Sequence, residues 1–190
     1  MIVKIKKCED YLVEFCAPTL AGIKCANLFG MMYGSEENLL NEVARLNMMC
    51  NDKGINIRIL QHQKNRALIF VFREKLLKSI LDNEAVWELL YGCGYQRDED
   101  LNSTLNVLKD RIETSDIFPH EIGIFLGYPY YDVKGFIDNA GNNYVFCGYW
   151  KVYENEKQSA KLFQAFDICS ECYRKCYGKG IPISRLLVAV

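Results

Sequence analysis

The chain has 190 residues, of which half are apolar and a quarter are charged, a composition typical of an ordinary soluble globular protein. Lysine and arginine together number 23, against 24 aspartates and glutamates, so the net charge is −1. This balance argues against a nucleic-acid partner, because nucleic-acid-binding proteins carry a clear basic excess.

The first quarter of the chain predicts a strand followed by two helices. In residues 10–16, "DYLVEFC", one set of side chains (Tyr11, Val13 and Phe15) alternates with another, which predicts a short strand. Pro18 then opens an expected helix over "LAGIKCANLFGMM", residues 20–32. Ser35 is a suitable N-cap for a second helix, because its hydroxyl accepts from an unpaired backbone amide, and Gly54 ends that helix.

The remaining elements combine a hairpin, several helices and one further strand. "INIRILQ" (55–61) and "RALIFVFR" (66–73) have the pattern of an antiparallel hairpin. Near the other end, "YVFCGYWKVY" (144–153) predicts a strand that is apolar on both faces. Apolar residues at helical spacing predict helices over residues 74–91, 101–112 and 156–177.

These elements predict the α+β class. We expect a single domain over residues 1–190, because no linker, repeat or low-complexity segment interrupts the chain. Its small, mainly antiparallel sheet would contain the hairpin 55–61/66–73 and strands near 10–16 and 144–153. Six or seven helices would cover that sheet.

Residues 118–137, "FPHEIGIFLGYPYYDVKGFI", combine a histidine with glycines, prolines and aromatic side chains. Pro119 suits the first turn of a helix, Gly127 suits its C-terminal cap, and Pro129 can begin a second helix. The stretch therefore predicts two short helices that meet near Gly127. Such a corner requires no ligand to explain it, because close packing accounts for the glycines and the rings.

This block is also the most specific part of a resemblance. Together with "CAPTLAGIKCANLF" (16–29) and "CGYWKVY" (147–153), it resembles an uncharacterised bacterial family, domain of unknown function family 3793, over nearly the whole chain. The resemblance implies a bacterial cytoplasmic setting. It implies no activity, cofactor or fold.

Several side chains around the corner are candidates for a ligand-binding surface. Tyrosine and tryptophan offer an apolar ring with a polar tip, and nearby glycines allow a ligand to approach the backbone. The candidates are Glu121, Tyr128, Tyr131, Asp132, Tyr149 and Trp150. Packing alone also explains these aromatic residues.

Cys16 and His120 form the one nucleophile–base pair that the sequence suggests. Each is expected at a helix start, where the positive dipole end favours a thiolate and a neutral imidazole. A Cys–His dyad could then attack an acyl or disulfide centre. The alternative is that Cys16 is a small buried apolar residue and His120 a structural histidine.

The nine cysteines indicate a reducing compartment more than a disulfide framework, since their number is odd and their spacing irregular. Three cysteines near the C-terminus are a candidate metal site: Cys169, Cys172 and Cys176. The outer two are seven residues apart, which is about 10 Å along a helix and too far for both to bind one zinc ion. We therefore expect no metal and no cofactor there.

No apolar run approaches the ~20 residues that span a bilayer, and the first residues lack the apolar stretch of a signal peptide. We expect a cytoplasmic protein with no membrane partner that binds a small-molecule ligand or a protein partner through residues 118–153. The alternatives are a Cys16–His120 hydrolase or transferase, and a thiol-based metal or redox sensor. The sequence does not predict the oligomeric state.

Overall fold

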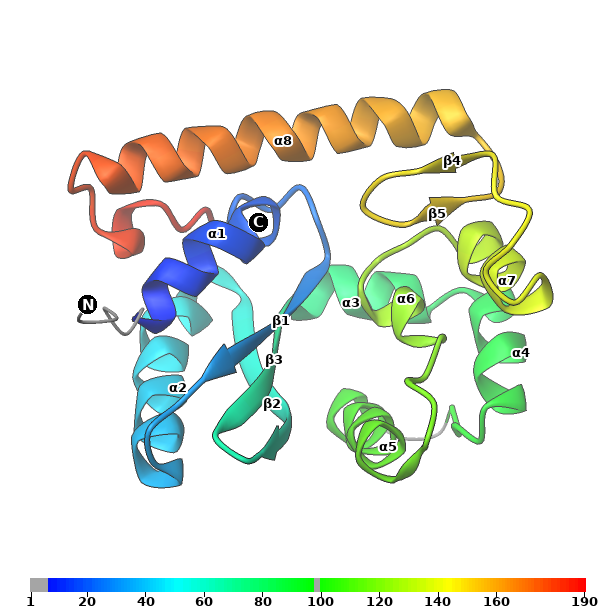
Figure 1. Cartoon of the computed structure of the whole chain (residues 1–190), viewed down its shortest axis with the longest axis horizontal. Coiled ribbons are helices and arrows are strands. Elements are labelled where there is room, and N and C mark those ends of the chain that lie inside the picture. The colour runs from blue at the N-terminus through cyan, green and yellow to red at the C-terminus, as the bar shows by residue number, and fades with distance from the viewer. Residues whose placement is uncertain (1–6, 98–99) are drawn as a thin grey trace. The chain divides into compact units, whose positions relative to one another are not determined.

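The computed structural model describes residues 7–97 and 100–190 (Figure 1). In this part the chain forms eight α-helices and two antiparallel sheets, of three and two strands. The α+β class is therefore confirmed. Two compact units can be separated: the described residues up to Glu74 together with Phe166–Val190, and Lys75–Ala165. The single domain over residues 1–190 stays a prediction.

The first unit contains the three-stranded sheet. Its strands β1 (Ala26–Met32), β2 (Ile55–Gln63) and β3 (Arg66–Arg73) are antiparallel in the order β1-β3-β2. The hairpin predicted from residues 55–61 and 66–73 is confirmed. Its turn residues Lys64 and Asn65 have φ angles of 47° and 64°, which a two-residue type I′ turn requires at both positions.

Helices complete the core of this unit. They are α1 (Cys8–Leu20), α2 (Glu36–Cys50), the short 3-10 helices η1 (Asn51–Lys53) and η2 (Ile183–Arg185), and the later residues of α8 (Glu156–Gly178). Ser35 caps α2 as expected, because its side chain accepts from the Asn38 amide. Leu12, Leu46 and Val71 are among the side chains that bring α1, α2 and the sheet into one apolar cluster.

Two predictions at the start of the chain are wrong. Residues 10–16 lie in α1 instead of a strand, and buried Leu12, Cys16 and Leu20 repeat every four residues. The helix expected over residues 20–32 is largely replaced by β1. The cause is tertiary: β1 pairs with β3 over its whole length, from Ala26 opposite Phe72 to Met32 opposite Arg66. This pairing overrides local helix propensity.

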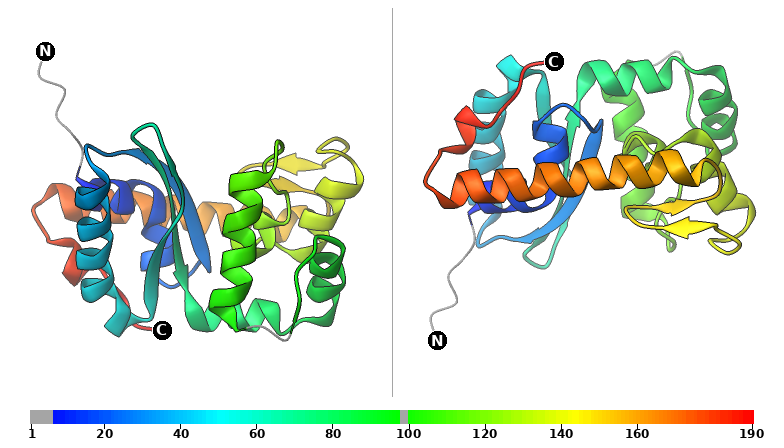
Figure 2. Two further views of the ribbon diagram at one scale, coloured as in Figure 1. Left: turned by 90° about the horizontal axis from the view of Figure 1, so that it is seen from below. Right: turned by 90° about the horizontal axis from the view of Figure 1, so that it is seen from above.

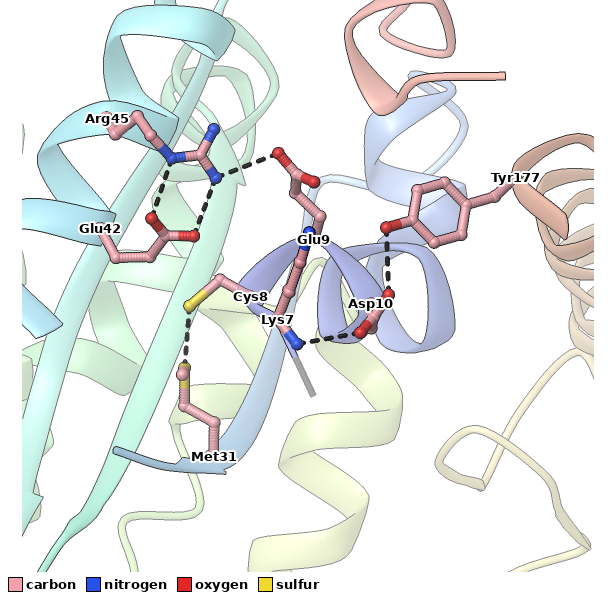
Figure 3. Close-up of polar contacts among 8 residues, drawn as sticks. All are labelled: Lys7, Cys8, Glu9, Asp10, Met31, Glu42, Arg45 and Tyr177. Carbon is pink, nitrogen blue, oxygen red and sulfur yellow. Dashed lines mark hydrogen bonds and ion pairs between the residues drawn. The ribbon is translucent and has the colours of Figure 1, made fainter. Parts of the chain in front are cut away.

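Polar contacts fix the first turn of α1 within the unit (Figure 3). The Arg45 guanidinium of α2 donates to Glu9 at 3.0 Å and to Glu42 at 2.8 Å. On α8, the Tyr177 hydroxyl donates to Asp10 at 3.0 Å. Cys8 and Met31 are in sulfur–sulfur contact at 3.5 Å. These contacts tie α1 to α2, α8 and β1.

The second unit is mainly helical. It contains α3 (Glu74–Leu81, beginning at the unit boundary), α4 (Glu84–Gly92), α5 (Leu101–Thr114), α6 (Ile122–Phe125), α7 (Tyr130–Asp138) and the first turns of α8. The helices expected over residues 101–112 and 156–177 are confirmed. The one expected over residues 74–91 is two helices, because the Asn83 side chain accepts from the Ala85 amide and starts α4. That break raises the number of helices above the expected six or seven.

The long strand expected over residues 144–153 is also wrong. Only β4 (Phe146–Cys147) and β5 (Lys151–Val152) are extended, and they pair with each other as a small hairpin. The chain reverses at Gly148, whose amide donates to the Trp150 carbonyl. A Cβ atom at Gly148 would lie 2.3 Å from the Phe163 ring, so only glycine fits this turn. Periodicity alone did not reveal the reversal.

Candidate functional site

The corner at residues 118–137 has the predicted form. Helices α6 and α7 are separate, and Gly127 lies between them with a φ of 76°, a left-handed conformation that glycine adopts readily. Helix α6 begins at Ile122, so Pro119 and His120 lie in the turn before it and not in its first turn as expected. The helix-dipole argument for His120 therefore has no structural basis.

Asp132 attaches α7 to the β4–β5 hairpin. The residue is 3% exposed, and its carboxylate accepts from the Trp150 indole N–H at 2.7 Å, from the Tyr153 amide at 2.7 Å and from the Glu154 amide at 3.2 Å. Figure 2 shows α7 and the hairpin side by side. A buried carboxylate with three donors is well compensated, so Asp132 holds the hairpin in place.

Two glycines of the corner permit close packing. A Cβ atom at Gly135 would lie 2.5 Å from the Tyr153 ring, and one at Gly123 would lie 2.8 Å from Val133. Both distances are shorter than real contacts allow. These positions therefore explain why α6, α7 and the hairpin approach one another so closely.

A pocket of about 340 Å³ lies between the corner and the hairpin, entirely within the second unit. Aromatic rings form much of its wall: Phe118, His120, Tyr128, Phe136, Tyr149 and Trp150. Asp132 also contributes to the lining. The structure thus brings His120 together with four of the six residues proposed as ligand-binding, although their binding role stays a prediction.

The rings are arranged in two groups. Tyr128 stacks on Trp150 with centroids 4.7 Å apart, and burial raises the pKa of the Tyr128 phenol. In the second group, the His120 ring meets the Phe136 ring edge-on at 4.9 Å. Such contacts hold aromatic side chains in defined orientations. The pocket wall is therefore largely preformed.

Two of the six proposed residues have other surroundings. Glu121 is buried, its carboxylate lies 2.5 Å from Arg111, and it accepts from the Tyr95 hydroxyl at 3.3 Å. Hydrogen bonding to Glu121 raises the pKa of Arg111. Tyr131 is 58% exposed and borders a separate pocket of about 120 Å³. Glu121 thus has a structural partner inside the unit, and neither residue lines the larger pocket.

Sequence reasoning missed several residues of this pocket. Phe118, Phe136, Cys147 and Lys151 line it although none was a candidate. Cys147 and Lys151 face each other across the β4–β5 pair, so they share a face of the hairpin. Had residues 144–153 been read as a hairpin with its turn at Gly148, this cross-strand pair could have been found.

Cys16 does not have the surroundings proposed for a nucleophile. It lies in the middle of α1, is fully buried in the first unit, and is absent from the residues that line the His120 pocket. Burial raises the pKa of its thiol, whereas a nucleophile needs an accessible thiolate. The surroundings of Cys16 therefore do not support the hypothesis of a Cys16–His120 dyad.

Cys169, Cys172 and Cys176 lie on the single helix α8, as predicted. Burial, followed by the neighbouring Cys172, raises the pKa of the Cys169 thiol. Among the described residues, no group of three or more histidine, cysteine, aspartate or glutamate side chains is arranged to hold a metal ion. All nine cysteines are free thiols.

A second hollow, of about 490 Å³, lies in the first unit beside Cys8, Met31 and Arg45. The charge of Arg45 is already neutralised there by Glu9 and Glu42 (Figure 3). Arg45 therefore offers a ligand in this hollow little uncompensated charge.

Comparison with known proteins gives one match. The model of the family described as "Protein of unknown function (DUF3793)" matches residues 12–187, so the chain belongs to this family. No curated protein and no solved structure matches the chain. In the part of the chain described, no helix combines the length and apolar character needed to cross a membrane.

Proposed function

We propose that this member of the DUF3793 family is a binding protein for a small planar molecule, which occupies the pocket between the 118–137 corner and the β4–β5 hairpin. The observation that carries the proposal is the aromatic wall around a volume of about 340 Å³. Pockets for small ligands typically measure about 300–1,000 Å³ and combine apolar walls with few polar groups. A flat ligand could stack on Tyr128 or Trp150.

The free state of all nine cysteines supports a cytoplasmic setting, because disulfides form in oxidising compartments. The resemblance of the 118–137 block to a bacterial family would place that setting in a bacterium. The Cys16–His120 alternative has less support, since its proposed nucleophile Cys16 is fully buried.

Binding of a neutral aromatic dye with a flat naphthalene ring, N-phenyl-1-naphthylamine, tests the proposal by fluorescence titration. The blocking variant is Cys147→Trp, which places a large side chain at an exposed lining position. The matched control is Cys172→Trp, because Cys172 is an exposed cysteine on α8 away from the lining. We expect the wild type and the control to bind the dye, and Cys147→Trp to bind it at least about tenfold more weakly.

Equal dye binding by all three folded proteins would show that this pocket is not the binding site. Absence of binding in the wild type would count against the proposal in the same way. Far-UV circular dichroism of each variant establishes that the comparison is made between folded proteins.

A further inference from the structure

The charges around the aromatic pocket are unevenly compensated. Lys151 lines the pocket, and its ammonium donates to the Gly141 carbonyl at 2.6 Å. The ammonium also lies over the Tyr144 ring at 4.8 Å and the Phe136 ring at 5.6 Å. Within the described residues, no carboxylate forms an ion pair with Lys151. Among these residues, its positive charge is therefore not neutralised.

Asp132, the carboxylate in the pocket lining, does not supply that neutralisation. Both of its oxygens already accept hydrogen bonds, Oδ2 from the Trp150 indole and Oδ1 from the Tyr153 and Glu154 amides. Because these three donors compensate the carboxylate, a ligand gains little by presenting a cation to it.

His120 adds a second polar group near Lys151. Its ring packs against Phe136, the same ring over which the Lys151 ammonium lies. Its side chain is exposed, and its ring nitrogens have no hydrogen-bond partner in the part of the chain that the structure describes. The Phe136 ring thus contacts both the His120 ring and the Lys151 ammonium, which has no carboxylate partner among the described residues.

We infer that the ligand of this pocket is a planar aromatic carboxylate whose ring stacks on the Tyr128–Trp150 side and whose carboxylate faces Lys151 and His120. The inference rests on the proposed function, because it assigns the chemical class of the molecule that the same pocket binds. Its basis is charge complementarity: an ammonium held over aromatic rings attracts an anion, and a carboxylate accepts hydrogen bonds from both an ammonium and an imidazole N–H. A cationic aromatic ligand would be repelled by the positive charge of Lys151.

Displacement of N-phenyl-1-naphthylamine by two isosteric probes tests the inference. 2-Naphthoate carries the carboxylate, whereas 2-naphthamide has the same ring and shape without the charge. We expect 2-naphthoate to displace the dye from the wild type at about tenfold lower concentration than 2-naphthamide. 2-Naphthylmethylamine, the cationic analogue, should be the weakest of the three.

Variants of Lys151 test whether this residue causes the preference for 2-naphthoate over 2-naphthamide. Lys151→Met should bind 2-naphthoate and 2-naphthamide equally. Lys151→Arg retains the positive charge and should keep the preference for 2-naphthoate. The control Lys161→Met removes an exposed lysine of α8 and should behave as the wild type. Equal displacement by 2-naphthoate and 2-naphthamide in the wild type would overturn the inference and leave the proposed function standing. A preference that survives in Lys151→Met would overturn it as well.

Failure of the dye itself to bind the wild type would instead remove the proposed function, and the ligand class with it. The two results are distinguishable because the dye carries no charge and does not depend on Lys151.

Discussion

The Asp132 carboxylate on α7 accepts a 2.7 Å hydrogen bond from the indole N–H of Trp150 in the β4–β5 hairpin, and both groups are buried. The two residues are 18 positions apart in the sequence. This bond sets the position of Trp150, which stacks on Tyr128 and forms one side of the aromatic pocket. The corner and the hairpin therefore form one structure around the pocket.

Asp132→Asn should destabilise the protein by about 1–3 kcal/mol, because an amide N–H₂ would face buried N–H donors and leave one of them unpaired. Asp138→Asn is the matched control on the same helix, since Asp138 is exposed and pairs with exposed Lys134. An exposed pair of this kind contributes roughly 0–1 kcal/mol. Urea unfolding followed by circular dichroism measures both variants, and equal midpoints would contradict the anchoring role of Asp132.

Gly127→Val should destabilise the protein by more than about 1 kcal/mol, and Gly127→Ala by less than Gly127→Val. The φ of 76° at this position is unfavourable for any residue with a Cβ atom and worst for a β-branched one. Gly178→Ala is the control, because a Cβ atom there meets nothing within 4 Å and φ is not positive. The control should be neutral or slightly stabilising. Thermal unfolding ranks the three variants, and a Gly127→Val protein as stable as the wild type would refute the left-handed cap.

Lys24→Met should stabilise the protein at pH 7. Lys24 is buried, and burial lowers its pKa from 10.5 to about 8, although its ammonium donates to the Ala26 carbonyl. Since the folded-state pKa is the lower one, the unfolded chain binds more protons between pH 8 and 10.5, and stability from this group rises with pH across that window. The variant lacks this cost and should be more stable by about 1–3 kcal/mol below pH 8.

The measurement is urea unfolding of both proteins at several pH values from 7 to 10.5. Burial raises the pKa of the Cys16 and Cys25 thiols and Lys24 lowers it, so the difference between the two proteins reports Lys24 together with its coupling to these thiols. The advantage of Lys24→Met should shrink as the pH approaches 10.5. A difference that does not change with pH would mean that Lys24 is not titrating in this way.

Iodoacetamide should alkylate Cys147 and Cys172 first and Cys16 last in the folded protein. The first two thiols are exposed, whereas Cys16 is fully buried and its pKa is raised by burial. We expect its rate to be at least about tenfold lower, because the thiolate is the reactive form. Peptide mapping by mass spectrometry follows each site, and labelling in urea, where all nine should react alike, is the control. Rapid labelling of Cys16 would contradict this prediction and support the hypothesis of a Cys16–His120 dyad.

Local sequence determined several features of this protein. Ser35 capped α2, the Lys64–Asn65 turn closed the hairpin, and Gly127 separated α6 from α7, because each depends on the conformational preferences of a few adjacent residues. The sequence also indicated that the 118–137 block and the residues near Tyr149 and Trp150 belong to one surface. These signals are short in range and need no partner from elsewhere in the chain.

Tertiary structure decided the rest. Residues 26–32 became a strand because β3 was available to pair with them, and residues 144–153 became a hairpin because Phe163 fits against Gly148 and Asp132 accepts from Trp150 and Tyr153. The hairpin placed Lys151 in the pocket, and the fold of the second unit placed Glu121 beside Arg111. Short apolar segments have similar free energies as helix and strand, so pairing and packing between distant residues make the choice.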